Sequence, residues 1–357
     1  MLGVTQSLEE ITVPDLASMP KAELHLHLEG APRWSTLRHA LHRHRGITLP
    51  ESPPWYEPKF RFASFDQFRA LFHRYIHPWL QTPVGYNELI CDVVDSLLEQ
   101  HIRYAEIDFY AASVERVGAS LDQVLAILEA EVERANAQGS VLKIFLGINR
   151  HDGVENAAFW VQRLISAPVI CGVDLHGSEV GWPADLFKAA LAPVREMGKK
   201  IKSHAGEMVG PEAIRAAVEG LGVRQIGHAV SAIQDPAVVE LLRDRKVVVE
   251  MCPTSNERLQ YISSYQDHPI FDLDAAGVAV TVNSDDPTCF GSNLTNELSR
   301  LIIERGATLA DLKRWTQNAF RYALIEEETL TPILSDLNTW FENVNSGSES
   351  TNSSPQY

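Results

Sequence analysis

The sequence predicts a single (β/α)₈ barrel, the TIM-barrel architecture, over residues 1–344. Two observations favour this fold. Eight short apolar segments rich in β-branched residues recur along the chain, and each ends in polar or glycine-rich residues. Amphipathic segments separate them, and strand alternating with helix in this way is typical of a parallel barrel. An open doubly wound sheet would need a glycine-rich phosphate turn after an early strand, and HLEGAP at 27–32 does not match that pattern.

The first strand is expected at 22–30, where leucines alternate with polar residues in AELHLHLEG. Period-two alternation predicts a strand, because successive side chains then point to opposite faces. The other seven strands are expected at 102–110, 141–150, 169–179, 200–207, 224–230, 247–256 and 278–287. From the third strand onward the starts are about one strand–helix unit apart, which fits a repeated βα unit.

Three of the intervening helices are well marked, and we expect them at 120–139, 210–222 and 235–246. Pro211 and Pro236 stand at the first helical positions, where proline costs no hydrogen bond. Gly139 and Gly222 follow the ends of two of these helices, the usual place for a glycine C-cap.

The first βα interval is much longer than the others. Residues 31 to about 100 must hold extra helices, and we expect them to cap the C-terminal mouth of the barrel as a lid. Phe65 and Phe68 are candidate apolar wall residues of this lid, although packing within a helix is the more common role of such a pair. The last stretch, 345–357, is poor in apolar residues and is expected to be a disordered tail.

Composition narrows the class of protein. Hydrophobic residues make up 45% and charged residues 22%, no apolar run reaches the roughly 18 residues of a membrane span, and the N-terminus lacks the features of a signal peptide. The four cysteines lie far apart, which favours the cytoplasm. A formal net charge of −16 disfavours nucleic acid and anionic membranes as partners, and it also disfavours heavily phosphorylated substrates unless a local basic pocket overrides it. No oligomeric state is predicted.

His25 and His27 are two apart in the first strand, so their rings point to the same face. They could form half of a metal site, although HxH alone is a weak signal. LHRHRG contains a second such pair, His42 and His44, in a helical pattern where residues two apart diverge by about 200°. We interpret that second pair as solvated surface.

Polar residues also stand at the ends of later strands, and in a barrel these ends converge on one rim. They are Gly177, His204, Glu207, His228, Asp285 and Asp286. Singly, each has an ordinary structural interpretation, such as a hydrogen-bonded histidine or an Asp-Pro turn. Together, three imidazoles and one carboxylate can hold zinc with a position left for water, whose pKa zinc lowers from 15.7 towards about 7. His228 and Glu207 are then spare for proton transfer.

Five motifs in order, ELHLHLEG, SHAGE, GHA, MCPTSN and NSDDP, resemble the adenosine deaminase family of the amidohydrolase superfamily. The resemblance covers about residues 20–290. It implies a zinc-dependent purine aminohydrolase that replaces the 6-amino group by oxygen and releases ammonia. The ligands of one zinc per chain would be His25, His27, His204 and Asp285.

The same resemblance implies the roles of the remaining residues. Glu207 would protonate purine N1, and His228 would orient and deprotonate the water. Asp286 would hold the N7 edge, and the backbone of Gly177 the N3 edge. The zinc deaminases with a His/Cys/Cys site also combine zinc-activated water with a glutamate that does not bind the metal. Their sequence signature, H-x-E…P-C-x-x-C, is absent here.

The motifs give mixed signals about which purine is the substrate. The adenosine-cleaving branch typically has Asp where Glu29 stands, near the sugar 5′ side, and HLEG is more similar to adenine deaminases. GVDLHGSE at 172–179 is closer to the adenosine branch. Adenosine or 2′-deoxyadenosine is the leading substrate, with adenine, aminodeoxyfutalosine and N6-substituted purines as alternatives.

Two other classes of function compete with a deaminase. A two-metal hydrolase on the same barrel would commonly need a carboxylated lysine at a strand end. Lys143 lies near the start of its strand and Lys202 precedes His204 by two residues, so neither is suitable. A non-catalytic relative would be expected to lack a ligand or the acid, and none is missing.

Overall fold

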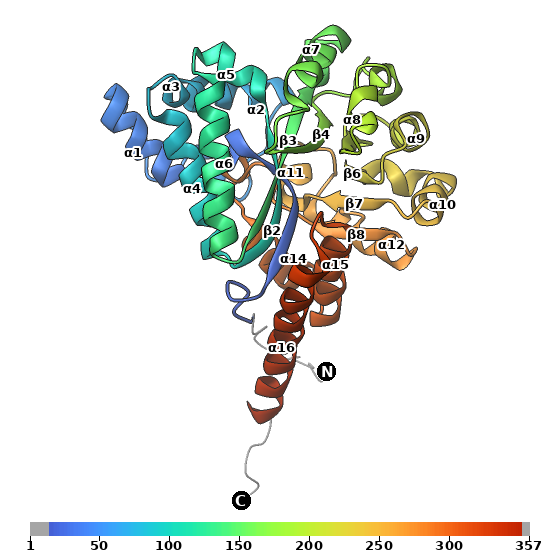
Figure 1. Ribbon diagram of the computed structural model, residues 1–357. Helices are drawn as coiled ribbons and strands as arrows, with labels where there is room; N and C mark the ends of the chain where they lie inside the picture. Colours follow the sequence, from blue (N-terminus) through green and yellow to red (C-terminus); the bar gives the residue numbers. More distant parts are fainter. Residues whose placement is uncertain (1–13, 352–357) are drawn as a thin grey trace, which may run out of the picture.

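Eight parallel strands follow one another around the barrel in sequence order, as the computed structural model shows for the residues that it describes, 14–351 (Figure 1). Each strand pairs with the next in parallel register. The strands are β1 (Lys21–His27), β2 (Ile102–Phe109), β3 (Val141–Asn149), β4 (Ile170–His176), β5 (Lys200–Ala205), β6 (Gln225–His228), β7 (Val248–Met251) and β8 (Ala279–Val282). The predicted (β/α)₈ barrel is confirmed, and every strand lies within its expected segment or one residue from it.

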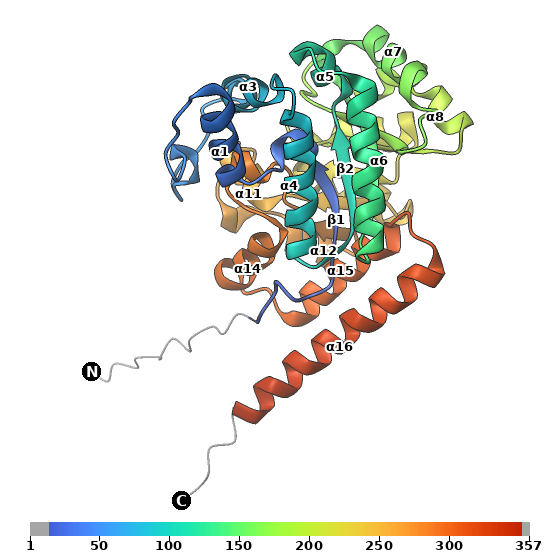
Figure 2. The same cartoon turned by 60° about the vertical axis from the view of Figure 1, so that its left-hand side comes forward.

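Helices surround the barrel on its outer side (Figures 1 and 2). In chain order they are α1 (Trp34–Arg45), α2 (Phe65–Leu71), α3 (His77–Leu80), α4 (Gly85–Glu99), α5 (Ala111–Val117), α6 (Leu121–Ala137), α7 (Val154–Leu164), α8 (Ala192–Glu196), α9 (Pro211–Arg215), α10 (Pro236–Asp244), α11 (Pro253–Arg258), α12 (Ile270–Ala275), α13 (Pro287–Phe290), α14 (Leu294–Arg305), α15 (Leu309–Tyr322) and α16 (Glu327–Thr351). Two π-helical segments continue α2 and α9, and they are η3 (Phe72–Ile76) and η6 (Ala216–Leu221).

The helix ends follow the capping rules that the sequence suggested. Ser120 caps α6 by accepting a hydrogen bond from the backbone of Gln123, and Asp235 caps α10 from the backbone of Ala237. Gly222 ends η6 in a left-handed conformation, with φ of 65°. The helix expected at 210–222 is present but turns π-helical halfway.

The barrel closes between β1 and the segment after β8. Leu26 and Asp285 form an isolated parallel bridge, in which the amide of His27 donates to the carbonyl of Asp285 at 2.9 Å. The amide of Leu24 donates to the side chain of Asn283 at 2.8 Å. β8 therefore ends earlier than expected, at Val282 rather than near 287, and Asp285 takes a left-handed backbone with φ of 66°. This closure brings the carboxylate of Asp285 beside the strand that carries the two histidines.

The long interval between β1 and β2 contains α1, α2, η3, α3 and α4. Ser64 caps α2 through the backbone of Gln67. Phe68 is buried, and its ring stacks on that of Phe290 after β8, with centroids 5.3 Å apart. The interval is therefore anchored to the segment that follows the last strand, at the carboxyl ends of the strands.

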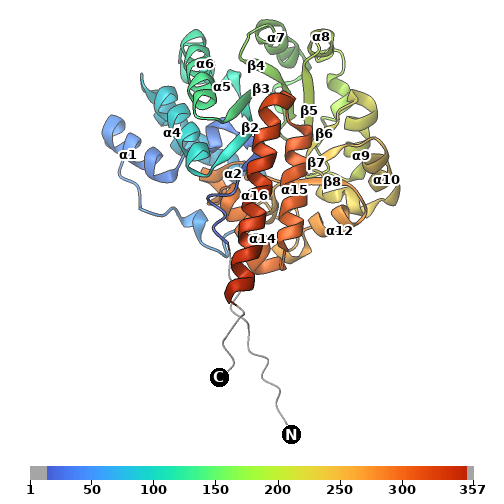
Figure 3. The ribbon, with the colours of Figure 1, turned by 60° about the horizontal axis from the view of Figure 1, so that its bottom comes forward.

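The last helix, α16, lies beside α15 at the opposite end of the barrel (Figure 3). Its buried residues include Ile333, Leu337 and Phe341, and Trp340 donates to Ser18 at 3.0 Å. Residues 345–351 of the expected disordered tail are helical, because the chain continues the hydrogen-bonded turns of α16; residues 352–357 lie outside the described residues. Among residues 14–351 there is no helix whose length and hydropathy would suit a membrane span.

Candidate metal centre and active site

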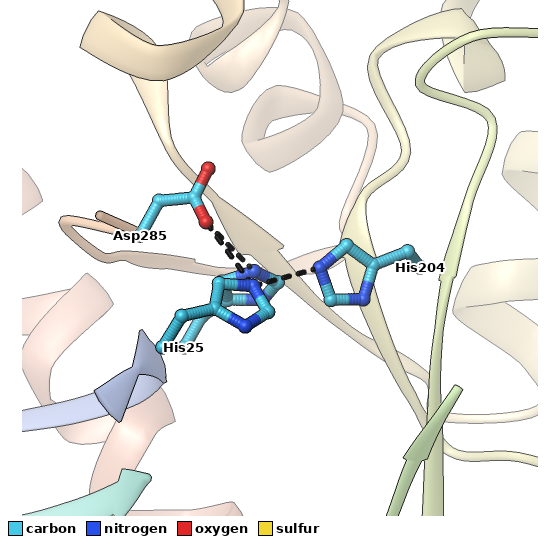
Figure 4. Close-up of side chains that lie close together, drawn as sticks. His25, His204 and Asp285 are labelled. Carbon is cyan, nitrogen blue, oxygen red and sulfur yellow. Dashed lines mark hydrogen bonds and ion pairs between the residues drawn. The ribbon is translucent and has the colours of Figure 1, made fainter. Parts of the chain in front are cut away.

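The predicted metal ligands come together at the carboxyl ends of three barrel segments (Figure 4). They are His25 and His27 from β1, His204 from β5 and Asp285 after β8, and their donor atoms all lie within 4.8 Å of one another. Nε2 of His27 is 3.2 Å from Nε2 of His204 and 3.3 Å from Oδ1 of Asp285. Nε2 of His25 is 3.5 Å from the same carboxylate oxygen. Three ring nitrogens and one oxygen therefore face a common point.

The other ring nitrogen of each histidine faces a buried carboxylate. Nδ1 of His25 lies 3.0 Å from Glu250 on β7, and Nδ1 of His204 lies 3.2 Å from Asp174 on β4. Such carboxylates fix the tautomer with the proton on Nδ1, which leaves Nε2 as a lone pair. His27 has a looser partner of the same kind on β2, because its Nδ1 is 3.7 Å from Asp108.

These residues fit a divalent zinc ion. Nε2 of His25 is buried without a hydrogen-bond partner among the described residues, although its ring is held on the other side. Nε2 of His27 and Nε2 of His204 are 3.2 Å apart, a separation that suits two nitrogen ligands of one zinc ion. Ser255 donates to Oδ2 of Asp285 at 2.6 Å and orients that carboxylate. Three histidines and one aspartate are a donor set that suits zinc with an open position.

Two further groups of donors lie beside this one and share members with it. His27, Asp108 and His176 form one, and His228, Cys252 and Asp285 form the other. The group of His25, His27, His204 and Asp285 has four donors, and each of its three histidines faces a carboxylate. We therefore assign the metal position to this four-donor group.

Beneath the ligands, a buried lysine neutralises the supporting carboxylates. Nζ of Lys202 lies 3.4 Å from Glu106, 3.6 Å from Glu250 and 3.7 Å from Asp174, and it donates to the carbonyl of Leu24. Burial lowers the pKa of Lys202, but the three carboxylates outweigh it and raise the pKa above its ordinary value. Lys202 is therefore a charged internal counter-ion, and its amino group is directed at these partners.

Glu207 follows β5, and hydrogen bonds from the backbone around it to the carboxylate of Glu179 hold this segment in place. Its amide donates to Oε1 of Glu179 at 2.9 Å, and the amides of Gly206 and Met208 donate to the same carboxylate at 2.7 and 2.9 Å. Burial, together with the charges of Asp285 and Glu179, raises the pKa of Glu207 well above its ordinary value. This environment favours the protonated form of the carboxyl group.

His228 lies at the end of β6, next to Glu207. Its Nε2 is 3.6 Å from Oε1 of Glu207 and 4.0 Å from Oδ2 of Asp285, and its Nδ1 is 3.1 Å from the side-chain nitrogen of Asn256. His228 has a left-handed backbone, with φ of 66°, which is unusual for a side chain of this kind. Burial lowers the pKa of His228 to about 3, against the opposing charge of Asp285, so the ring is neutral.

Asp286 directly follows Asp285, and Gly177 directly follows the end of β4. Oδ1 of Asp286 is buried and has no hydrogen-bond partner among residues 14–351. Burial and the neighbouring Asp285 raise the pKa of Asp286 well above its ordinary value, although His27 opposes them. Gly177 has φ of 83°, and a Cβ there would come within 2.5 Å of the Asn149 side chain. Only glycine fits this position without strain.

A cavity of about 140 Å³ contains the metal position and extends to the helices after β1. The predicted site residues that line it are His27, Glu29, Gly177, His204, Glu207, His228, Asp285 and Asp286, and His25 lies just behind them. Phe65 and Phe68 also line it, and their rings pack at 5.5 Å, so both interpretations of this pair apply. Oε1 of Glu29 is buried with no partner in the described part of the chain.

The structure leaves the second histidine pair outside the site. His42 is exposed on α1, and His44 is half-buried and lies 3.0 Å from Glu88. Both histidines of this pair are therefore surface residues of α1, as expected from the helical spacing.

Sequence analysis missed the residues that support the site. They are Asp108, Asp174, Glu179, Glu250, Ser255, Asn256 and the cavity-lining His176. A usable signal was present for three of them, because Asp108, Asp174 and Glu250 are acidic residues inside otherwise apolar strands. Such residues are almost never fully buried unless they are paired.

Comparisons with known proteins identify the family of this chain. The sequence model of the family described as adenosine deaminase matches residues 20–340. The aminodeoxyfutalosine deaminase of Streptomyces avermitilis is 31% identical over 287 residues, 79% of this chain and 80% of that protein. The adenine deaminase of Streptomyces coelicolor is 30% identical over 323 residues, 88% and 92% of the two chains. The crystal structure of an adenine deaminase from Arthrobacter aurescens matches with a TM-score of 0.83 at 25% identity, over 91% of this chain and all of that one.

The match extends over nearly the whole barrel and includes every strand that contributes to the site. The chain therefore belongs to the adenosine deaminase family of hydrolytic purine deaminases.

Proposed function

We propose that this protein hydrolyses the exocyclic amino group of a 6-aminopurine that carries a sugar at N9, with adenosine and 2′-deoxyadenosine as the leading substrates. The observation that carries the proposal is the convergence of His25, His27, His204 and Asp285 next to two proton-transfer residues, Glu207 and His228. In the reaction a C6–O bond forms, the C6–N bond breaks, and ammonia leaves.

The four ligands would hold one zinc ion. Bound zinc would lower the pKa of water from 15.7 towards about 7. The remaining roles belong to side chains of this chain. His228, neutral and buried, would accept the proton that the attacking water loses. Glu207, whose raised pKa supports the protonated form, would donate to purine N1 and make C6 more electrophilic.

The polar atoms of the purine would be held at its two edges. N7 and N3 are hydrogen-bond acceptors, so each needs a donor. The raised pKa of Asp286 supports a protonated carboxyl, which would donate to N7. The backbone amide of Gly177 would donate to N3, and the absence of a side chain there allows close approach.

The extent of the cavity lining supports a nucleoside over the free base as substrate. The cavity lining extends from the metal position to Phe65 and Phe72 of the inserted helices and to Arg116 of α5. Adenine remains a second candidate, because the chain is similar to adenine deaminases over most of its length.

The proposal is tested by ammonia release from purified zinc-loaded protein. The panel contains adenosine, 2′-deoxyadenosine, aminodeoxyfutalosine and adenine. We expect the nucleosides to be deaminated with a higher kcat/KM than adenine. Faster turnover of adenine would overturn the assignment to nucleosides, and no ammonia from any purine on the panel would overturn the proposed function.

A further inference from the structure

Four basic side chains that are not among the proposed metal ligands also line the cavity. They are Arg69 on α2, His73 on η3, His77 on α3 and Arg116 on α5, and all four line the cavity. We call this set the cationic wall. α3 and α5 lie side by side, so the wall is built from segments on both sides of β2 (Figure 1). Such a cluster is unusual in a chain with a formal net charge of −16.

Arg116 is the best placed member of the cationic wall. Its guanidinium lies over the ring of Tyr110 at 5.4 Å and donates to the Tyr110 hydroxyl at 3.0 Å. Its nearest carboxylate, Asp152, is 3.4 Å away and also accepts from Tyr110. The Arg116 side chain is still 45% exposed, so several of its N–H groups remain available to a ligand.

The other three members extend the wall along the inserted helices. Arg69 has only a distant partner, because Asp66 lies 3.5 Å away and is itself 88% exposed. The rings of His73 and His77 meet edge to face with centroids 4.8 Å apart. Burial, aided by the neighbouring His73 and Arg116 side chains, lowers the pKa of His77 to about 4. His77 is therefore neutral at pH 7, and the positive charge that we assign to the wall comes from the two guanidinium groups.

Carboxyl groups line the same cavity, and most of them lie at the metal position. Among the described residues that line it, carboxyl groups belong to Glu29, Glu207, Asp285 and Asp286. The last three surround the metal position, and Glu29 follows the ligand His27 by two residues and is buried. Asp66 and Asp152 pair with the wall from outside the cavity lining. A ligand that fills the cavity therefore meets both carboxyl groups and guanidinium groups.

With C6 at the metal position, the N9 substituent of the purine would extend into the rest of the cavity, which the cationic wall also lines. C6 must face the metal position, and N9 is on the far side of the bicyclic ring from C6. We propose that the physiological substrate carries an anionic group, a carboxylate or a phosphate, on the sugar attached at N9, and that the cationic wall binds this group. This inference rests on the proposed function, and within the class of N9-substituted 6-aminopurines it favours anionic nucleosides over adenosine and 2′-deoxyadenosine.

The test uses two pairs of purine nucleosides that differ in charge at the 5′ side. Adenosine-5′-carboxylic acid is compared with its neutral carboxamide, and adenosine 5′-monophosphate with adenosine. kcat and KM are measured for zinc-loaded protein at low and high salt. At least one anion should exceed its neutral partner in kcat/KM by about tenfold, mainly through KM, since hydrogen bonds to charged groups have roughly this value. The advantage should shrink at high salt.

Variants assign the effect to the wall. In Arg116→Gln the ratio of anionic to neutral kcat/KM should fall by about tenfold, and Arg69→Gln should lower it in the same direction. Arg163→Gln is the matched control, because Arg163 is a 41% exposed arginine outside the cavity that pairs with Glu115. Its ratio should match the parent protein. The ratio is internal to each preparation, so partial loss of folded protein does not affect it.

The outcomes separate the inference from the function on which it rests. If adenosine is deaminated but neither anion exceeds its neutral partner, the cationic wall is not a substrate site and the proposed function stands. Equal ratios in Arg116→Gln and the parent protein would also overturn the inference. If no purine is deaminated, both fail. The pair with the larger ratio identifies carboxylate or phosphate as the source of the charge.

Discussion

Replacing Glu207 by glutamine is expected to leave the metal centre intact and to remove most of the turnover. The carboxyl group is buried, and its neighbours are His228 at 3.6 Å and Asn256 at 3.4 Å. Glutamine has the same shape, and its amide oxygen can still accept from Asn256. The backbone hydrogen bonds from residues 206–208 to Glu179 do not involve the changed atoms. The fold should therefore be retained.

The size of the effect follows from the role of the proton. Burial and the charges of Asp285 and Glu179 raise the pKa of Glu207, which supports a protonated acid near neutral pH. A glutamine amide can donate a hydrogen bond to N1 but cannot transfer a proton to it. Loss of a general acid costs about 10²–10⁴-fold in rate, which corresponds to roughly 3–5 kcal/mol of transition-state stabilisation.

The assay measures zinc content and kcat on the same sample. Glu207→Gln should bind zinc as the parent protein does, with kcat reduced by about 10²–10⁴-fold. His204→Ala is the matched comparison, because it removes a ligand nitrogen that lies 3.2 Å from the corresponding nitrogen of His27. That variant should lose both zinc and activity. Loss of zinc from Glu207→Gln, or retention of more than about a tenth of its kcat, would refute the separation of acid from ligand.

Three further changes have defined outcomes. Glu250→Gln weakens the contact that orients His25, so zinc affinity should fall by about 10–100-fold in competition with a chelator, and an unchanged affinity would contradict that role. Gly177→Ala forces a Cβ to within 2.5 Å of Asn149 at a φ of 83°, so both Tm and kcat/KM should fall, and retention of both would show that this edge is not tightly packed. His268 is buried, and burial, aided by Arg305 and His228, lowers its pKa from 6.5 to about 3. Between about pH 3 and 6.5 the unfolded chain therefore binds a proton at His268 that the native state does not bind. The free energy of unfolding should therefore fall with acidification by up to about 1.4 kcal/mol per pH unit from this group, and urea unfolding of His268→Gln should lack this part of the slope.

Much of the fold could be predicted from the sequence, because each strand and many helix ends carry local signals. The apolar segments fixed the strand positions, and Pro211, Pro236 and Gly222 marked helix boundaries that the structure keeps. The end of the last strand could not be predicted in this way. It depends on the left-handed backbone of Asp285 and on its bridge to Leu26, which is a contact between the two ends of the barrel.

The ligand candidates could be found because strand ends converge in a barrel, whatever their distance in sequence. The supporting residues could not, because their role depends on which neighbour they face. Glu250 and His25 are far apart in the chain and meet only across the barrel interior. The cationic wall could not be predicted for the same reason, because Arg69 and Arg116 come from separate helices and nothing in the sequence marks them as cavity residues.

Zinc titration of chelator-treated protein, with deamination of adenosine followed at each addition, tests the central claim most directly. We predict that activity returns in proportion to added zinc and reaches its maximum at about one zinc per chain. His25→Ala should fail to recover under the same conditions, because Nε2 of His25 is one of the converging donors. Full activity without metal, or a maximum that requires two zinc ions per chain, would contradict the mononuclear centre on which this account depends.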